Sequence, residues 1–489
     1  MKIKHLYSLI LGAALAFTGC DSLLEEDVYS QLDPGALFTS AQGVERVLYS
    51  AYRNAQFNGN FGGNIEFQEE WTADQFWETG GAVNLQATVM LAFTWDAAYP
   101  TQNTDLWNNC YASIRNCNLV LENIDAAPLD DTVKARLAAE ARFVRCAAYY
   151  KLLMRYGGVP LRTSNAGDLE TARSSAEEIG SFIETELLAA IDPLPKLISE
   201  VSGYQYGRAT KGAAMGYLCK YYLNTRQWQK CADMAKKIMD LGVYELWDDY
   251  TTLFTVENEL KNKEFIWVYT SSPLDVGNEL MNGSFPPQYA SAVDGSMPFL
   301  PNMRNWARMD RIYDSFYNSF DENDARRKTI LTEYINTAGK VISLLNNDNT
   351  RMFKYVPDPN SNGNAQGNDI PVIRYADILL ARAEALNEMS GPTQEAVDLI
   401  NQVRTRSKVT PIQLGNYTKE SLRAHILDER GWEFYGENLR RQDLLRHDVF
   451  IKKAKERGVS IADDHHKLFP IPQPEINANP LCTQNPGYN

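Results

Sequence analysis

Three groups of residues have side chains that could do covalent or metal chemistry. Carboxylates cluster at Glu69, Glu70 and Asp74, and a glycoside hydrolase needs two carboxylates about 5 to 9.5 Å apart. His465 and His466 could bind a metal, but a zinc site needs further ligands at a suitable spacing. The sequence has no HExxH, GxSxG or P-loop motif. These patterns favour a protein that is not an enzyme, and we predict no cofactor and no metal.

Aromatic and polar side chains occur together in two regions of weak periodicity. A sugar ring has an apolar face that stacks on an aromatic ring, and its hydroxyls need carboxylates, amides or Arg as partners. Peptides use similar platforms. Any single ring can instead pack its loop onto the core. The residues with this chemistry are Trp71, Asp74, Trp77, Trp95 and Tyr99 in the first region, and Tyr289, Phe299, Arg304, Asn305 and Trp306 in the second.

The N-terminus has the pattern of a secretory signal. Lys2 and Lys4 precede an apolar block from Leu6 to Phe17, which is shorter than the roughly 20 residues that span a bilayer. The block ends at Gly19-Cys20, which resembles the lipobox of bacterial lipoproteins, where the cysteine is acylated. We predict a signal peptide over 1–19 and a lipidated tether over 20–39. The acidic run Glu25-Glu26-Asp27 in the tether resembles the surface-export signal of some outer-membrane lipoproteins.

Composition bounds the partners and the cysteine chemistry. The formal net charge is −14, and removal of the two signal lysines makes it about −16. Nucleic acid needs a basic footprint, so we exclude it as a partner. Six cysteines remain after Cys20, several of them on apolar helical faces and none in a CxxC pair. We favour buried free thiols, although an exported protein can also form disulfides.

Helical periodicity dominates both ends of the chain. Apolar residues at three-and-four spacing predict helices over 40–55, 107–124, 132–156, 210–224, 227–241, 370–389, 393–407 and 418–446. Gly157, Gly158 and Pro160 form a strong helix stop, and Ser175 with Glu178 forms a capping box. Between the two helical regions the periodicity fades, apart from a short strand predicted over 263–271.

These elements predict a mainly α fold. Helical hairpins of this length suggest a divergent tetratricopeptide-like array, whose regular unit has about 34 residues. We divide the mature chain into helical repeats over 40–243 with a ligand loop near 57–103, a loop-rich insertion over 244–368, helical repeats over 369–450, and a Pro-rich tail over 451–489 packed on the body.

Several segments in this order resemble the SusD/RagB nutrient-uptake lipoproteins. They are WNNCYASIRNCN from Trp107, AEARFVR from Ala139 leading to RYGGVP at Arg155, RYADILLARAEA from Arg374, ILDERGWEFYGENLRRQDLLR from Ile426, and the tail HKLFPIPQPEINANP from His466. The resemblance covers essentially the whole chain. It implies a SusD-like α-α superhelix on the outer surface of an outer membrane. It also implies that the protein captures oligosaccharides, or peptides in the RagB branch, for a SusC-like TonB-dependent transporter.

The resemblance also guides the site. Ligand contacts in the family come from loops outside the repeats, and Asp74 matches a position where a carboxylate binds sugar hydroxyls. Trp95 resembles a stacking tryptophan of such a loop. We therefore predict a ligand site formed by Trp71, Asp74, Trp77, Trp95, Tyr99, Tyr289, Arg304, Asn305 and Trp306. The helical motif charges, by contrast, are expected to pair with each other between packed helices. A peptide-capturing protein, a protein-only adaptor and a glycoside hydrolase stay as alternatives.

Overall fold

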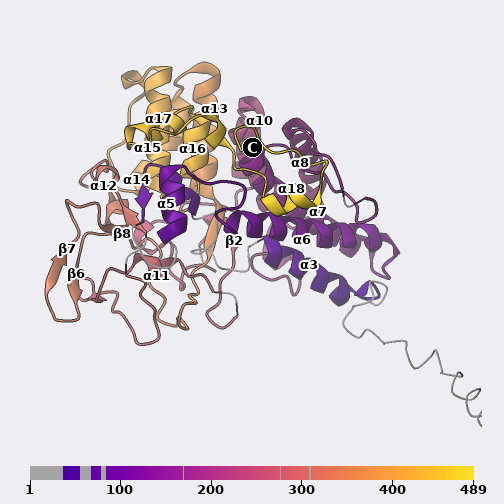
Figure 1. Cartoon of the computed structure of the whole chain (residues 1–489), viewed down its shortest axis with the longest axis horizontal. Helices are drawn as coiled ribbons and strands as arrows, with labels where there is room; N and C mark the ends of the chain where they lie inside the picture. Colours follow the sequence, from indigo (N-terminus) through magenta and orange to yellow (C-terminus); the bar gives the residue numbers. More distant parts are fainter. Residues whose placement is uncertain are drawn as a thin grey trace, which may run out of the picture.

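A computed structural model describes residues 37–55, 68–78, 84–168, 170–260, 262–275, 277–307 and 310–488. The predicted signal peptide, Cys20 and the tether up to position 36 lie outside these residues. The N-terminal helices lie on the right of Figure 1, the C-terminal helices at its upper left, and the insertion at its lower left. Among the described residues, none of the helices combines the length and the apolar content that a membrane span requires.

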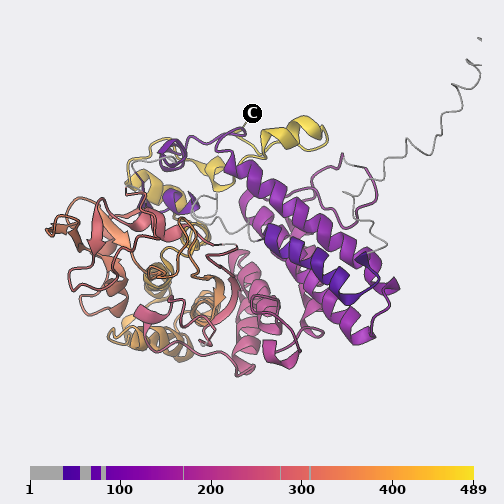
Figure 2. The same cartoon turned by 90° about the horizontal axis from the view of Figure 1, so that it is seen from below.

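The N-terminal helices form a stack in which each packs against the next. The pairs in contact are α3 with α6, α6 with α7, α7 with α8, α8 with α9, and α9 with α10. Figure 2 shows α3 lying along α6. The helices of the stack are α3 (Ala41–Ala55), α6 (Gln102–Asn123), α7 (Asp131–Tyr156), α8 (Ala176–Ile191), α9 (Lys211–Asn224) and α10 (Trp228–Asp240). The helix α5 (Asn84–Ala92) lies apart from the stack, on the left of Figure 1, and packs against the turn Glu69–Thr72. The stack confirms the predicted array of helical hairpins.

Local sequence explains where these helices begin and end. The apolar face predicted for α3 is the buried one, with Val44 and Leu48 fully enclosed. Ser175 and Glu178 form the predicted capping box of α8, which satisfies backbone N–H groups at the helix start. Gly157 ends α7 with a φ of +71°, a conformation that glycine adopts without steric cost.

The C-terminal helices continue the stack, because α10 packs against α13 and α13 packs against α14 and α15. Two predicted boundaries are wrong. Residues 370–374 form strand β9 (Ile370–Arg374) and not the start of a helix, and Gly436, at φ +70°, separates α15 from α16. The helices are α13 (Tyr375–Ser390), α14 (Gln394–Arg406), α15 (Lys419–Phe434), α16 (Arg440–Arg446), α17 (Phe450–Glu456) and α18 (Gln473–Ala478).

Short strands hold the insertion together and join it to β1 of the first loop and to β9. One sheet has the order β1-β4-β8-β5, a second the order β3-β6-β7, and β2 pairs with β9. On one face of the first sheet, Phe76, Ile312, Thr350 and Met352 are buried. The elements are β1 (Phe76–Trp77), β2 (Phe265–Tyr269), α11 (Leu280–Ser284), β3 (Tyr289–Ser291), β4 (Arg311–Ile312), α12 (Asp314–Tyr317), β5 (Ile330–Leu331), β6 (Glu333–Asn336), β7 (Val341–Ser343) and β8 (Thr350–Met352).

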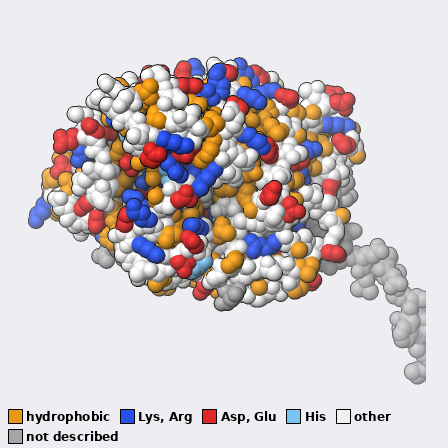
Figure 3. Space-filling model, turned by 90° about the horizontal axis from the view of Figure 1, so that it is seen from above, with side chains coloured by type: hydrophobic (Ala, Val, Ile, Leu, Met, Phe, Trp, Pro, Cys, Tyr) orange, Lys and Arg blue, Asp and Glu red, His pale blue; other side chains and the backbone are white. Residues whose placement is uncertain are grey.

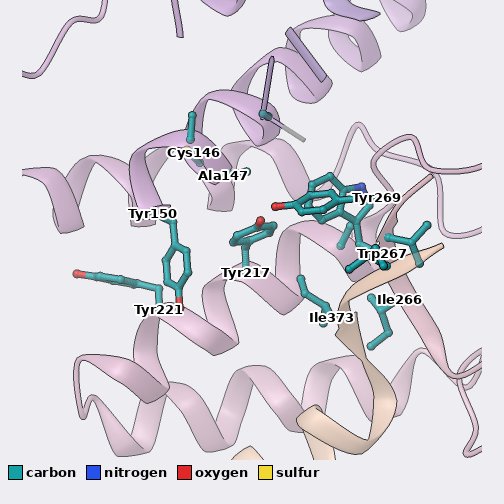
Figure 4. Close-up of a cluster of buried hydrophobic side chains, with 14 of the residues drawn as sticks. Cys146, Ala147, Tyr150, Tyr217, Tyr221, Ile266, Trp267, Tyr269 and Ile373 are labelled. Atoms are coloured by element: carbon teal, nitrogen blue, oxygen red, sulfur yellow. The ribbon is translucent and has the colours of Figure 1, made fainter. Parts of the chain in front are cut away.

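An aromatic cluster joins the helical stack to the β2-β9 pair. Tyr150 of α7, Tyr217 of α9 and Trp267 of β2 pack edge to face, with ring centroids about 5.5 Å apart for each contact (Figure 4). Ile373 of β9 lies beside them. All six cysteines beyond Cys20 are buried free thiols, as predicted.

The surface carries both signs of charge. Figure 3 shows Lys and Arg side chains around a hollow on the upper face, with acidic side chains among them.

Candidate functional site

The charged residues of the helical motifs pair with one another between packed elements. Arg374 contacts Glu264 at 2.5 Å, Glu433 at 2.7 Å and Glu437 at 2.6 Å, and all four side chains are buried. Burial alone would raise the pKa of Glu433, but the guanidinium groups around it hold that pKa well below its usual range. These charges pair with one another between packed elements, as the sequence predicts.

The other motif charges are partnered in the same way. The pairs are Arg142 and Arg145 with Glu186, Arg382 with Glu395, Glu384 with Arg446, Glu429 with Arg326 and Arg404, Arg430 with Asp377 and Asp443, and Arg440 with Asp74.

The last of these pairs changes the role of Asp74. The Arg440 guanidinium donates two hydrogen bonds to the Asp74 carboxylate, at 2.7 and 3.0 Å. Burial opposes ionisation of Asp74, yet Arg440, with Lys453 and Arg457 nearby, lowers its pKa below the usual range. Both carboxylate oxygens are engaged, so Asp74 holds the first loop on α16 instead of reading sugar hydroxyls. This pairing argues against the sugar-binding role predicted for Asp74, which stays a prediction.

Two predicted stacking residues, Trp71 and Trp95, are enclosed by the core. Trp71 is 0% exposed and Trp95 is 3% exposed. The Trp95 indole N–H donates to the Tyr488 hydroxyl at 2.7 Å, and its ring packs against Phe93 and Phe469. Neither ring presents a face to solvent. They are packing residues in this structure, which corrects the ligand-binding role predicted for them.

Of the two tyrosines predicted to bind ligand, Tyr289 is buried and Tyr99 is partly exposed. Tyr289 is 1% exposed, donates its hydroxyl hydrogen to the Met297 carbonyl oxygen at 2.9 Å, and packs against Phe353. It therefore supports the insertion from inside. Tyr99 is partly exposed, in a turn where the Asp96 carboxylate accepts a hydrogen bond from the Tyr99 N–H at 2.8 Å.

One face of the β1-β4-β8-β5 sheet brings Trp77 together with residues far away in the sequence. Cross-strand partners share a face of an antiparallel sheet, and the register pairs Trp77 with Arg311 and Arg311 with Arg351. The Arg311 guanidinium lies 5.0 Å from the centre of the Trp77 ring. Tyr313 stacks on the same ring with centroids 6.3 Å apart. The indole N–H of Trp77 donates to the Asp348 carbonyl at 2.7 Å, which fixes the ring.

The loop 302–307 presents the remaining predicted residues. The Trp306 N–H donates to the Asn282 carbonyl at 2.8 Å. The Asn305 side-chain amide donates to the Pro286 carbonyl at 2.8 Å and accepts from the Ala307 N–H at 2.7 Å. These bonds hold the loop while the side chains of Asn305 and Trp306 stay partly exposed.

This loop lies next to the Trp77 face of the sheet. Arg351 links the two, because its guanidinium donates to the Ala307 carbonyl at 3.4 Å. Arg304 is exposed at the start of the loop, and Arg311 is partly exposed on the sheet. We call the set Trp77, Arg304, Asn305, Trp306 and Arg311 the binding face. It contains two aromatic rings, the Asn305 amide and two cationic side chains, which are the kinds of group that recognise a polyhydroxylated ligand.

Buried charges lie directly behind the binding face. Glu78 follows Trp77 and Asp310 precedes Arg311 in the chain, and both carboxyls are almost fully buried. Burial and the nearby Glu78 carboxylate raise the pKa of Asp310 to about 7. Burial and the neighbouring Arg311 lower the pKa of Arg351 to about 9. These groups form a charged support for the face, with one carboxyl partly protonated near neutral pH.

Sequence reasoning missed the residues that complete this site. Glu78, Asp310, Arg311 and Arg351 lie in or beside strands of two or three residues. Such strands are too short to show an alternating pattern. The adjacency of Glu78 to Trp77 was the one available signal, and it is shared by many acidic residues of this chain.

One group of possible metal ligands occurs in the described ranges. Asp463, His465 and His466 place ligand atoms within 4.8 Å of one another. However, His466 Nδ1 accepts a hydrogen bond from the Asp463 N–H at 3.1 Å, and its Nε2 faces the Phe93 carbonyl at 2.9 Å. Both ring nitrogens of His466 are therefore already used, and the arrangement fits a turn better than a metal centre.

Family models match both ends of the chain. A model described as "SusD family" matches residues 303–488, and one described as "Starch-binding associating with outer membrane" matches residues 23–223. The chain is 25% identical to the SusD-like protein P25 of Formosa agariphila, over 100% of this chain and 99% of that protein. It is 26% identical to the starch-binding protein SusD of Bacteroides thetaiotaomicron, over 77% and 76% of the two chains.

Solved structures share the fold along almost the whole chain. A SusD homologue from Bacteroides thetaiotaomicron superposes with a TM-score of 0.81 at 23% identity, covering 94% of this chain and 99% of that one. A laminarin-binding SusD-like protein gives 0.78 at 24% identity, covering 91% and 99%. Surface glycan-binding protein A from Bacteroides thetaiotaomicron, in complex with laminarihexaose, gives 0.73 at 20% identity, covering 90% and 98%.

The helical superhelix with its insertion thus defines a SusD-type binding protein. The chain belongs to the SusD-like family.

Proposed function

We propose that this chain is a lipid-anchored surface protein that captures oligosaccharides and passes them to a SusC-like TonB-dependent transporter of the outer membrane. It binds its ligand and does not catalyse a reaction. The observation that carries the proposal is the binding face, where Arg351 joins the sheet that holds Trp77 and Arg311 to the loop that presents Arg304, Asn305 and Trp306.

The chemistry of the face suits a sugar. An aromatic ring covers the apolar side of a pyranose, while amide and guanidinium groups donate to its hydroxyls. Two of the similar solved structures are a laminarin-binding protein and a complex with laminarihexaose, and both ligands are oligomeric or polymeric sugars. The proposed anchor at Cys20 would hold the soluble body near its transporter, since multiple acyl chains bind a membrane stably.

The test uses the mature chain made soluble by Cys20→Ala, titrated calorimetrically with a panel of neutral and charged oligosaccharides and with a peptide library. We expect stoichiometric oligosaccharide binding, and Trp306→Ala should weaken it about tenfold, which corresponds to about 1.4 kcal/mol. The matched control is Trp228→Ala, because Trp228 is also partly exposed but lies on α10.

Other outcomes point to other functions. Binding of peptides alone would indicate a RagB-like peptide-capturing protein. Binding only to a transporter barrel would indicate an adaptor, and release of shortened sugars would indicate a glycoside hydrolase. Equal losses for Trp306→Ala and Trp228→Ala would remove the binding face from the proposal.

A further inference from the structure

A cleft of about 560 Å³ lies along α6. Among the described residues, it shares no lining residue with the binding face. Trp107, Asn108, Tyr111 and Arg115 of α6 line one wall. The loop 161–168 forms the other wall, and Glu475 of α18 closes one end, where it accepts a hydrogen bond from the Trp107 indole at 3.3 Å. Figure 1 shows α18 lying beside α6. We call this the α6 cleft.

The loop wall of the α6 cleft is fixed before any ligand arrives. The Asn118 side-chain amide donates to the Arg162 carbonyl at 3.1 Å. Glu122 accepts hydrogen bonds from the Ser164 hydroxyl and the Asn165 N–H, both at 2.7 Å. Because the backbone of the loop is already bonded to α6, little ordering entropy remains to oppose binding.

The floor of the cleft is aromatic. The Tyr111 ring is partly exposed and packs against Trp107 with centroids 5.0 Å apart. Its hydroxyl donates to the Pro160 carbonyl at 2.8 Å, which fixes the orientation of the ring. Leu161 lies beside it in the lining. The floor therefore offers a rigid apolar surface.

The rim of the cleft carries unused polar groups. Asn108, Arg115 and Asp168 are exposed, and within the described residues their side chains make no hydrogen bond or ion pair. Together they offer an amide, a cationic donor and an anionic acceptor. The positive charges of Arg115 and Arg162 are balanced by the negative charges of Asp168 and Glu475, so the cleft has no basic excess to attract a polyanion.

We propose that the α6 cleft is a second saccharide site, which binds a short stretch of an uncharged oligosaccharide. An aromatic floor with a rim of mixed donors and acceptors is the arrangement such a ligand needs. The volume falls within the range of about 300 to 1,000 Å³ that is typical of small-molecule sites. The inference rests on the proposed glycan-binding function and adds a site to it.

The experiment counts sites by calorimetry on the full mature chain carrying Cys20→Ala, with laminarihexaose and other neutral hexasaccharides as probes. We expect two sites in this protein, of which Trp306→Ala weakens one about tenfold and leaves the other unchanged. Adding Asn108→Ala and Asp168→Ala to the Trp306→Ala variant should weaken this other site at least about tenfold, since each lost hydrogen bond costs about 1 kcal/mol. Adding Asp105→Ala instead, an exposed α6 residue outside the cleft, should leave it unchanged.

The outcomes separate this inference from the proposed function. A single site whose affinity Trp306→Ala lowers would overturn the second site and leave the proposed function standing. A second site whose affinity survives the Asn108→Ala and Asp168→Ala changes would lie outside the α6 cleft and overturn the inference. Absence of any hexasaccharide or other glycan binding would overturn the proposed function, and the second site with it. Unchanged thermal unfolding curves verify that each variant is folded.

Discussion

At the scale of single residues, tryptophans of this chain differ in whether the core encloses them. Trp95 is enclosed by Phe93, Phe469 and Tyr488, whereas Trp306 lies partly exposed on a loop whose backbone is bonded to Asn282. Only a ring that stays partly exposed, as that of Trp306 does, can offer a face to a ligand.

Asp74 gives the sharpest prediction at this scale. Asp74→Ala leaves the buried Arg440 guanidinium unpaired, so we expect the free energy of unfolding to fall by about 3 kcal/mol or more. Oligosaccharide affinity should stay within about twofold, because the carboxylate is committed to Arg440. Urea denaturation and calorimetry measure the two quantities. Loss of affinity at unchanged stability would restore the ligand-binding role to Asp74.

At the scale of elements, backbone contacts fix the path of the loop that follows α7. After α7 ends, the chain forms an isolated bridge between Pro160 and Arg173, and the Ser174 N–H donates to the Val159 carbonyl at 2.9 Å. This return brings residues 161–168 alongside α6, where they form the wall of the α6 cleft.

The backbone path between residues 157 and 174 leaves no room for a side chain at Gly158. A Cβ atom at Gly158 would lie 2.2 Å from the Ser174 carbonyl oxygen, so one of the two backbone segments must move. We expect Gly158→Ala to lower the free energy of unfolding by about 1 to 3 kcal/mol, the usual cost of overpacking. Gly415→Ala is the matched control, since no atom lies within 4 Å of its added Cβ, and it should change stability by less than about 0.5 kcal/mol. Equal effects in urea denaturation would contradict the steric argument.

At the scale of the whole molecule, buried carboxyls should set the pH dependence of stability. Burial raises the pKa of Glu70 to about 8, and burial with Glu78 raises that of Asp310 to about 7. A raised folded-state pKa means that the folded protein holds more protons than the unfolded one, so stability falls as pH rises through these values. Glu384 and Glu433, whose pKa values their Arg partners hold low, act only at acidic pH.

We therefore expect the urea midpoint to decline between pH 6.5 and pH 8. Below that window, His425 and His466, whose pKa values burial lowers from 6.5, act in the opposite direction. Glu70→Gln removes one ionisation and should make the decline shallower. A midpoint that is flat across this window, or a slope that Glu70→Gln leaves unchanged, would show that these carboxyls do not control stability.

Some features of this protein are encoded by a regular pattern along the sequence, and others are not. The amino-acid sequence by itself determined the family, the periodic helices such as α3 and α7, the capping box of α8 and the pairing of the helical motif charges. These depend on many residues in regular spacing, and a period of 3.6 over several turns is legible without knowing the partner element.

Only the tertiary structure decided which aromatic rings reach the surface, which carboxylates are already paired, and where the sites lie. Asp74 meets Arg440 across 366 positions of the chain, and Trp77 meets Arg311 through strands of two residues. A contact of this kind leaves no local period in the sequence, because its energy comes from burial and pairing that exist only after distant elements have packed.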